Sequence, residues 1–182
     1  MGMNSEGDVE LDKESNTVDV AYEKVQEEGL EQSEKMADTI QAALDMSNVD
    51  SSQVEITTTS QYVMLSLSSG ILFDSGKADL KAEAISVVDK VADAVKIYDD
   101  NTISIEGHTD NMPIHNAYFQ SNWELSTQRA INTWNLMRND EPGFNSLTNP
   151  RGDPIFSCSG YAETRPIKDN GLNPNSDAGR AA

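Results

Sequence analysis

Residues 103–131 read ISIEGHTDNMPIHNAYFQSNWELSTQRAI, and this stretch decides the fold because a polar loop joins a strand pattern to a helix pattern. Ile103 and Ile105 alternate with polar residues, which is typical of a strand with one buried face. Gly107 interrupts the alternation, so Asp110 is expected at the carboxyl-terminal end of that strand.

The second half of this stretch carries a helix start signal. Ser121 is followed three residues later by Glu124, which has the form of a capping box, and a helix is predicted over residues 122–138. One stripe of this helix is polar and contains Asn122, Ser126 and Arg129. The neighbouring stripe is apolar and contains Trp123, Ala130, Trp134 and Met137. We expect the apolar stripe to pack on a sheet, and Asp110 and Arg129 to flank a shallow cleft that suits a zwitterion.

The flanking residues complete an alternation of strands and helices. Alternating apolar residues predict a strand pair within residues 51–69. A helix follows, capped by Asp79 or Ser75 and ending near Tyr98, and a last strand is predicted within residues 154–161. The order β-β-α-β-α-β predicts an α+β fold, a two-layer α/β sandwich.

The N-terminal third differs from the rest in composition. Residues 1–17 are acidic and poor in apolar groups, and are predicted to be disordered. Residues 18–50 have helical spacing in two pieces separated by Gly29 and are predicted to form a linker helix region. Its narrow apolar stripe suits either a stalk that packs or self-associates, or a solvated helix. Residues 51–182 form the predicted folded domain.

Charge and cysteine content exclude several classes of function. The net charge is −18, and residues 1–60 hold 15 acidic residues and 3 lysines. Such a surface repels nucleic acid, anionic membranes and anionic wall polymers, so any contact with a cell wall must come from local chemistry. The single cysteine, Cys158, allows no internal disulfide and is expected as a buried strand thiol.

Four motifs in the right order resemble the family of OmpA-like peptidoglycan-binding domains. They are ILFDSGKADL at 71–80, GHTDN at 107–111, NWELSTQRA at 122–130, and SGYAETRP at 159–166 followed by GRAA at 179–182. The segments MPI at 112–114 and FQSNWE at 119–124 look more narrowly like the MotB family of flagellar stator proteins. The resemblance covers about residues 50–182 and implies a sandwich of the OmpA C-terminal type, whose final strand would follow Ala182.

The resemblance implies peptidoglycan binding and indicates candidate residues. By the family motif, Asp110 and Arg129 hold the ammonium and carboxylate of diaminopimelate in the stem peptide, because a guanidinium can bind a carboxylate through two parallel hydrogen bonds. Asn122 and the Thr109 backbone orient the ligand, and Leu125 packs beneath it. No catalytic residue, metal or cofactor is expected. The alternative is an internal salt bridge between Asp110 and Arg129 that only ties the strand to the helix.

Resemblance to the MotB family further implies the extracytoplasmic part of a stator subunit. That part forms a homodimer, anchors a flagellar motor to peptidoglycan, and is joined to a MotA-like subunit through an N-terminal membrane helix outside this sequence. One alternative is a generic OmpA-like wall anchor not involved in motility, and another is a scaffold that binds only protein.

Catalytic and metal readings are weaker. A hydrolase built on Ser126, His108 and Asp110 lacks a nucleophile elbow and a Gly-rich oxyanion loop. His108 and His115 are too few for a closed zinc site. Trp123 and Trp134 are expected as core anchors of the helix.

Overall fold

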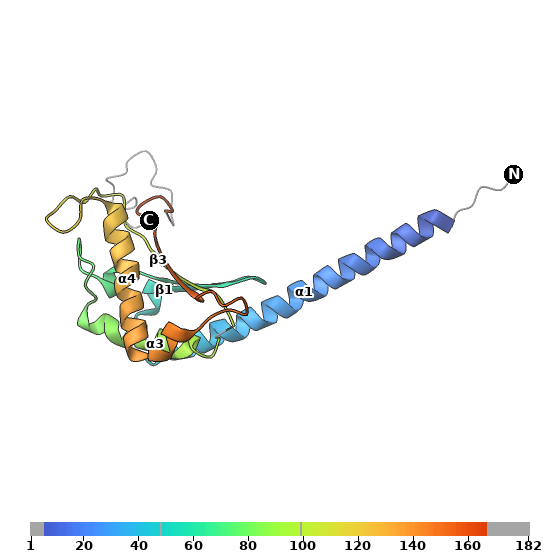
Figure 1. The fold of residues 1–182 in the computed structure, drawn as a ribbon, viewed down its shortest axis with the longest axis horizontal. Coiled ribbons are helices and arrows are strands. Elements are labelled where there is room, and N and C mark those ends of the chain that lie inside the picture. Colours follow the sequence, from blue (N-terminus) through green and yellow to red (C-terminus); the bar gives the residue numbers. More distant parts are fainter. Residues whose placement is uncertain (1–5, 48, 99, 167–182) are drawn as a thin grey trace.

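The computed structural model describes residues 6–47, 49–98 and 100–166, with side chains from residue 22 onward. It contains, in chain order, α1 (Glu6–Asp45), β1 (Val54–Thr58), β2 (Val63–Leu67), α2 (Ser69–Leu72), α3 (Ala82–Val95), β3 (Ile103–Gly107), α4 (Asn122–Asp140) and β4 (Phe156–Gly160). Short 3-10 helices at Ser51–Gln53 and Pro142–Ser146 precede β1 and β4. This order confirms the predicted α+β fold, to which the structure adds the single-turn helix α2 (Figure 1).

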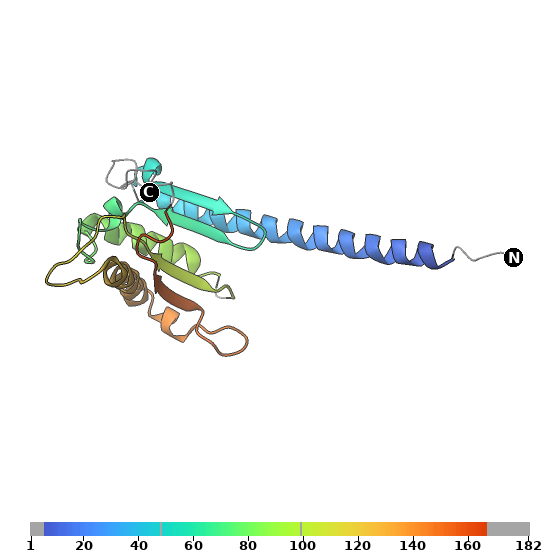
Figure 2. The same cartoon turned by 90° about the horizontal axis from the view of Figure 1, so that it is seen from above.

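The strands form two separate pairs in the described part of the chain. β1 pairs with β2 in antiparallel register, whereas β3 pairs with β4 in parallel, with Ile103 opposite Phe156 and Gly107 opposite Gly160. A parallel pair needs a crossover connection. Helix α4 belongs to that crossover and packs on both strands (Figure 2). The two glycines therefore lie side by side at the same end of the pair.

The core is built around α3. Its residues Ala84, Val87 and Val88 are buried, and α3 packs against both α1 and α4. Ile40 and Leu44, near the end of α1, belong to the same core. Each such apolar side chain contributes about 1.5–3 kcal/mol when fully buried. The last turns of α1 are therefore part of the folded domain and not only a linker.

Helix α1 is continuous across Gly29, where the sequence predicted a break. A Cβ atom at Gly29 would collide with the carbonyl oxygen of Ser60, so this glycine allows the β1–β2 turn to approach the helix. The side chain of Ser60 also hydrogen-bonds that of Gln26. Residues 6–17, predicted to be disordered, continue the same helix, which fits the low cost of extending a helix once it has formed.

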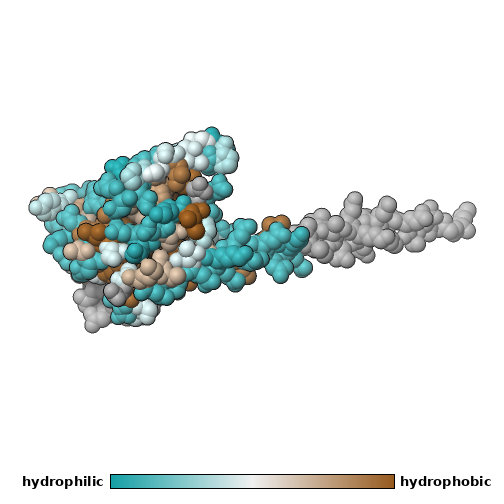
Figure 3. Space-filling model, turned by 90° about the horizontal axis from the view of Figure 1, so that it is seen from below, coloured by the Kyte–Doolittle hydropathy of each residue, from teal (hydrophilic) through white to brown (hydrophobic). Residues whose placement is uncertain are grey.

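Beyond these contacts, α1 projects from the rest of the molecule (Figures 1 and 2). The face shown in Figure 3 is mostly hydrophilic, with separate apolar patches. Among the helices of the described residues, none combines the length and the apolar composition needed to span a bilayer.

Helices α3 and α4 begin differently. Ser121 is the N-cap of α4, and its Oγ accepts a hydrogen bond from the Glu124 N–H at 3.4 Å, which confirms the predicted cap. The carboxylate of Glu124 accepts from the N–H of Gln120 at 2.7 Å. The predicted cap of α3 is wrong, because α3 begins after Lys81 and has no side-chain cap. The N–H of Lys81 instead donates to the carbonyl of Leu72 at 2.9 Å, a contact that the local sequence does not reveal.

The two tryptophans of α4 have different environments. Trp134 stacks on Phe156 and Phe144, with ring centroids 4.4 and 6.3 Å away, which confirms it as a core anchor. Trp123 is 51% exposed, so the expectation that it anchors the core is wrong. It lies in the first turn of the helix, at the margin of the buried face.

Candidate functional site

The polar stripe of α4 is buried against the rest of the domain, whereas the sequence predicted that it borders a shallow cleft. Asn122, Ser126 and Arg129 are all buried. The cause is the pair Gly107 and Gly160, because a Cβ atom at either position would collide with atoms of α4. Without those Cβ atoms the helix comes close to the strands, and polar side chains are needed there to satisfy nearby backbone groups.

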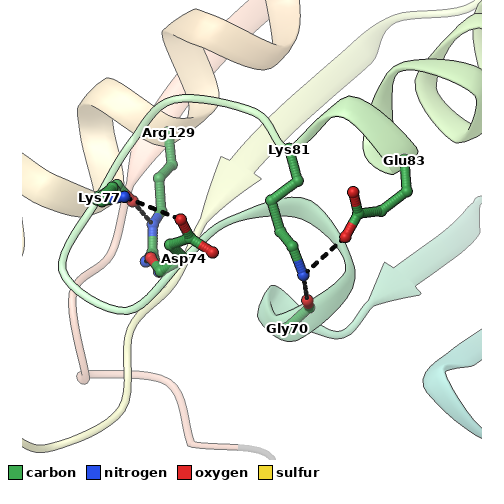
Figure 4. A network of polar contacts seen from close by, with 6 residues as sticks. All are labelled: Gly70, Asp74, Lys77, Lys81, Glu83 and Arg129. Atoms are coloured by element: carbon green, nitrogen blue, oxygen red, sulfur yellow. Dashed lines mark hydrogen bonds and ion pairs between the residues drawn. The ribbon is translucent and has the colours of Figure 1, made fainter.

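Arg129 is held by the loop between α2 and α3. Its Nε donates to the carbonyl oxygen of Lys77 at 2.9 Å, and its Nη2 donates to that of Asp74 at 3.2 Å (Figure 4). The guanidinium carbon also lies 4.9 Å from the centroid of the Phe73 ring. Its Nη1 has no hydrogen-bond partner within the described residues. The guanidinium is therefore fixed in place while part of its donor capacity stays unused.

Arg129 and Asp110 interact electrostatically without forming an ion pair in the described part of the chain. Burial lowers the pKa of Arg129, and the negative charge of Asp110 opposes this shift. The Asp74 carboxylate, in the loop that holds Arg129, pairs with Lys77 at 2.9 Å and not with Arg129. The arrangement thus differs from the internal salt bridge between Asp110 and Arg129 that was considered as an alternative.

Asp110 is exposed at the start of the loop that follows β3. One carboxylate oxygen accepts a hydrogen bond from the Met112 N–H at 3.1 Å, and the other has no partner within the described residues. Buried Asn122 fixes this loop, because its Nδ2 lies 3.1 Å from the Met112 carbonyl oxygen and 3.4 Å from that of Asp110. The same atom lies 3.0 Å from a carboxylate oxygen of Glu163. Asn122 therefore positions the loop, and its donor capacity is already used.

Two other predicted residues have supporting positions. The Thr109 N–H, expected to orient a ligand, already donates to the Ala162 carbonyl at 2.9 Å. The Thr109 hydroxyl is buried and has no hydrogen-bond partner in the described chain. Leu125 is buried in α4. The structure brings all five predicted residues to one region, where Asp110 and Arg129 retain groups that can meet a ligand.

The catalytic and metal readings find no support in the geometry. Ser126 is fully buried, and its Oγ accepts from the Ala162 N–H at 3.1 Å, so it is not placed as a nucleophile. The His108 ring stacks on Tyr161 with centroids 5.5 Å apart, and burial lowers its pKa while Glu106 opposes the shift. No group of metal-ligating side chains occurs within the described residues. Cys158 is half-buried, and burial raises the pKa of its thiol.

The sequence did not reveal which residues hold Arg129 and Asn122 in place. Asp74 and Lys77 contribute backbone carbonyls to Arg129, and Glu163 contacts Asn122. Every residue has a backbone carbonyl, so the sequence does not show which carbonyls bind a side chain. Asp74 and Lys77 do lie within the motif at residues 71–80. Gly76, between them, has φ of +68°, a conformation that glycine adopts readily and that marks the loop as a specific turn.

Comparison with protein families gives one match that spans most of the domain. The OmpA family model matches residues 72–179. Motility protein B of Bacillus subtilis is 38% identical over 119 residues, which are 65% of this chain and 42% of that protein. The chain thus spans less than half of the length of this relative.

Two solved structures have a similar fold. A MotB-like protein from Desulfovibrio vulgaris superposes with a TM-score of 0.68 at 23% identity, covering 86% of this chain and 88% of the other. The cell wall anchor of the type VI secretion system (T6SS) from Pseudomonas aeruginosa gives a TM-score of 0.58 at 25% identity, covering 72% and 82% of the two chains.

Proposed function

The chain belongs to the OmpA family, and from this premise we propose that it binds peptidoglycan without catalysis and anchors its parent assembly to the cell wall. One observation supports the proposal above the others: Arg129 is buried and fixed, yet forms no ion pair within the described residues and keeps Nη1 unpaired. The hydrogen bonds of this buried cation go to neutral carbonyl groups, and the negative charge of Asp110 offsets only part of the cost of burial, so an anion is needed to complete its environment.

The ligand proposed for the site is the zwitterionic end of diaminopimelate in a stem peptide. Its carboxylate accepts from Nη1 of Arg129, and its ammonium donates to the unpaired carboxylate oxygen of Asp110. Each charge-assisted hydrogen bond contributes about 1.5–3 kcal/mol net. After the cost of association, two of them support single-site binding in roughly the micromolar to millimolar range. Firm attachment to a wall then needs many copies acting together.

The proposed assembly is a flagellar stator. Identity of 38% to Motility protein B over most of the domain supports it. In this proposal the domain lies outside the cytoplasmic membrane, forms a homodimer, and is connected to a MotA-like subunit through a membrane segment of the parent protein. A wall anchor of another system is the second candidate, favoured by the similarity to the T6SS anchor of Pseudomonas aeruginosa. Co-purification of a MotA-like subunit with the parent protein from its own membranes separates the two.

Binding is tested by titrating the domain with free meso-diaminopimelate, followed by NMR, and by co-sedimentation with purified sacculi. Asp110→Asn removes the charge that meets the ammonium, and we expect binding to weaken about 10- to 100-fold. Asp50→Asn is a matched control, because exposed Asp50 accepts from the Ser52 N–H at 2.9 Å, as Asp110 does from Met112. Arg129→Lys keeps the charge and loses the fork, and is expected to weaken binding to a similar extent.

The outcomes are distinct. Weaker binding in Asp110→Asn and in Arg129→Lys, with Asp50→Asn unchanged, supports the site. Unchanged affinity of Asp110→Asn for diaminopimelate would reject it, as would equal losses in Asp110→Asn and Asp50→Asn.

A further inference from the structure

Two large aromatic side chains next to the N-terminus of α4 are exposed to solvent. Tyr118 is 85% exposed and Trp123 is 51% exposed. Together with Phe119 they line a hollow of about 450 Å³, whose other lining residues are Glu124, Thr127 and Gln128. The hollow is shallow and open to solvent, so a ligand would lie across it and not inside it. Exposed aromatic faces are favourable binding surfaces, because covering them removes a large apolar area from water.

The turn that carries Tyr118 is fixed by hydrogen bonds. The Asn116 side-chain oxygen accepts from the N–H groups of Tyr118 and Phe119, both at 2.8 Å. The Asn116 N–H donates to the Phe119 carbonyl at 2.9 Å, and the Gln120 N–H donates to the Glu124 carboxylate at 2.7 Å. The turn is thereby attached to the first turn of α4, which carries Trp123. Rings held in this way lose little conformational entropy when a ligand covers them.

The polar groups of the hollow are mainly hydrogen-bond acceptors. Glu124 keeps one carboxylate oxygen without a partner in the described chain. The Thr127 hydroxyl donates to the Trp123 carbonyl at 2.7 Å, so its proton is already used and it does not serve the ligand as a donor. Gln128 donates through Nε2 to Asn132 at 2.8 Å, which leaves its amide oxygen. The lining includes no cation, so the hollow fits a neutral ligand that donates hydrogen bonds and disfavours an anion.

We propose that this aromatic hollow binds the glycan strand of peptidoglycan, a neutral backbone of β-linked N-acetylated amino sugars. The proposal rests on the proposed function, since the glycan and the stem peptide belong to the same polymer. A pyranose ring has an apolar face of C–H groups that stacks on Trp123 and Tyr118, and an edge of hydroxyl and amide N–H donors for the acceptors of the hollow. A second copy of this chain fits less well, because stable protein interfaces bury about 800 Å² on each partner and this hollow has six lining residues.

The hollow and the candidate diaminopimelate site lie on either side of the N-terminus of α4. Asn122, the first residue of the helix, fixes the Asp110 loop, and Trp123 is the next residue. In this proposal the charged groups bind the stem peptide, and the aromatic groups bind the sugar. One wall fragment that carries both parts would contact both sites.

The test is an NMR titration of the domain with chitotetraose, a sugar that carries no peptide. The chain has two tryptophans, so the indole N–H signals of Trp123 and Trp134 report separately. We expect chitotetraose to shift the Trp123 signal and to leave that of Trp134, stacked in the core, unchanged. Trp123→Ala is expected to bind the sugar about tenfold more weakly, and Trp123→Phe, which keeps an aromatic face, to bind nearly as the parent does. Tyr62→Ala is the matched control, since Tyr62 is 54% exposed and lies outside the hollow.

Each result decides for or against the proposal. A shift confined to Trp123, a loss in Trp123→Ala and no loss in Tyr62→Ala support it. An unmoved Trp123 signal overturns it, as does equal sugar binding by Trp123→Ala. A Trp123 signal that moves with protein concentration and not with sugar also overturns it and assigns the hollow to a second copy. Because chitotetraose lacks diaminopimelate, failure here leaves the Asp110 titration unaffected, and the two proposals fail separately.

Discussion

Replacing Gly107 with alanine tests how α4 is positioned over the strands. The added Cβ atom would overlap the carbonyl oxygen of Ser126. Because that oxygen belongs to the backbone of α4, no side-chain rotation can relieve the overlap, and the helix must move away from β3. Overpacking typically costs about 1–3 kcal/mol, and a clash with helix backbone is expected near the upper limit. For a chain of this length, about 3 kcal/mol corresponds to a decrease in Tm of about 6–12 °C.

Thermal unfolding followed by far-UV circular dichroism measures this effect. Gly143→Ala is the control, because a Cβ atom at Gly143 would have no neighbour within 4 Å. We expect its stability to stay within about 0.5 kcal/mol of the parent. A displaced α4 also moves Arg129 away from Asp110, so Gly107→Ala should bind diaminopimelate more weakly. Stability of Gly107→Ala within 1 kcal/mol of the parent would refute the close packing on which the site depends.

Two further predictions concern the core around α4. Burial and the neighbouring carboxyl group of Asp140 raise the pKa of Asp89 to about 6, so Asp89 destabilises the fold when ionised. The stability that protonated Asp89 contributes should therefore be lost as the pH rises from 4 to 7. Asp89→Asn should match the parent at pH 4 and exceed it by about 1 kcal/mol at pH 7, which urea unfolding of both proteins at both pH values would measure. Trp134→Ala removes a ring stacked at 4.4 Å on Phe156 and should cost about 3–5 kcal/mol, whereas Trp123→Ala should cost less than about 1 kcal/mol. Equal costs for the two variants, measured by the same unfolding curves, would contradict the assigned environments.

Local patterns predicted the strands and the helices α3 and α4, because the causes of these elements are mostly local. The alternation of Ile103 and Ile105 indicated β3, and the pair Ser121 and Glu124 indicated the start of α4 within one residue. Contacts between distant segments are different. The start of α3 depends on a hydrogen bond from Lys81 to Leu72, and no side chain near Lys81 carries that information.

The orientation of α4 was not predictable from its own residues. A polar stripe usually faces solvent, but here it packs on strand ends that lack side chains at Gly107 and Gly160. These glycines belong to different strands, and their importance depends on the parallel pairing of β3 with β4. A glycine at each strand end was visible in the sequence, yet only the topology shows that both meet the same helix.

The burial of Arg129 explains how a strongly acidic chain can keep a cation available for a ligand. On a surface with a net charge of −18, an exposed arginine would be occupied by nearby carboxylates, as Arg165 is by Glu106 at 3.3 Å. Carbonyl oxygens of Asp74 and Lys77 instead hold Arg129, and they satisfy donors without neutralising the charge. The side chain is already ordered, so binding does not require its entropy to be lost again. If the proposed function is right, Arg129→Met should weaken diaminopimelate binding more than it lowers the stability of the fold, because the buried charge is itself costly.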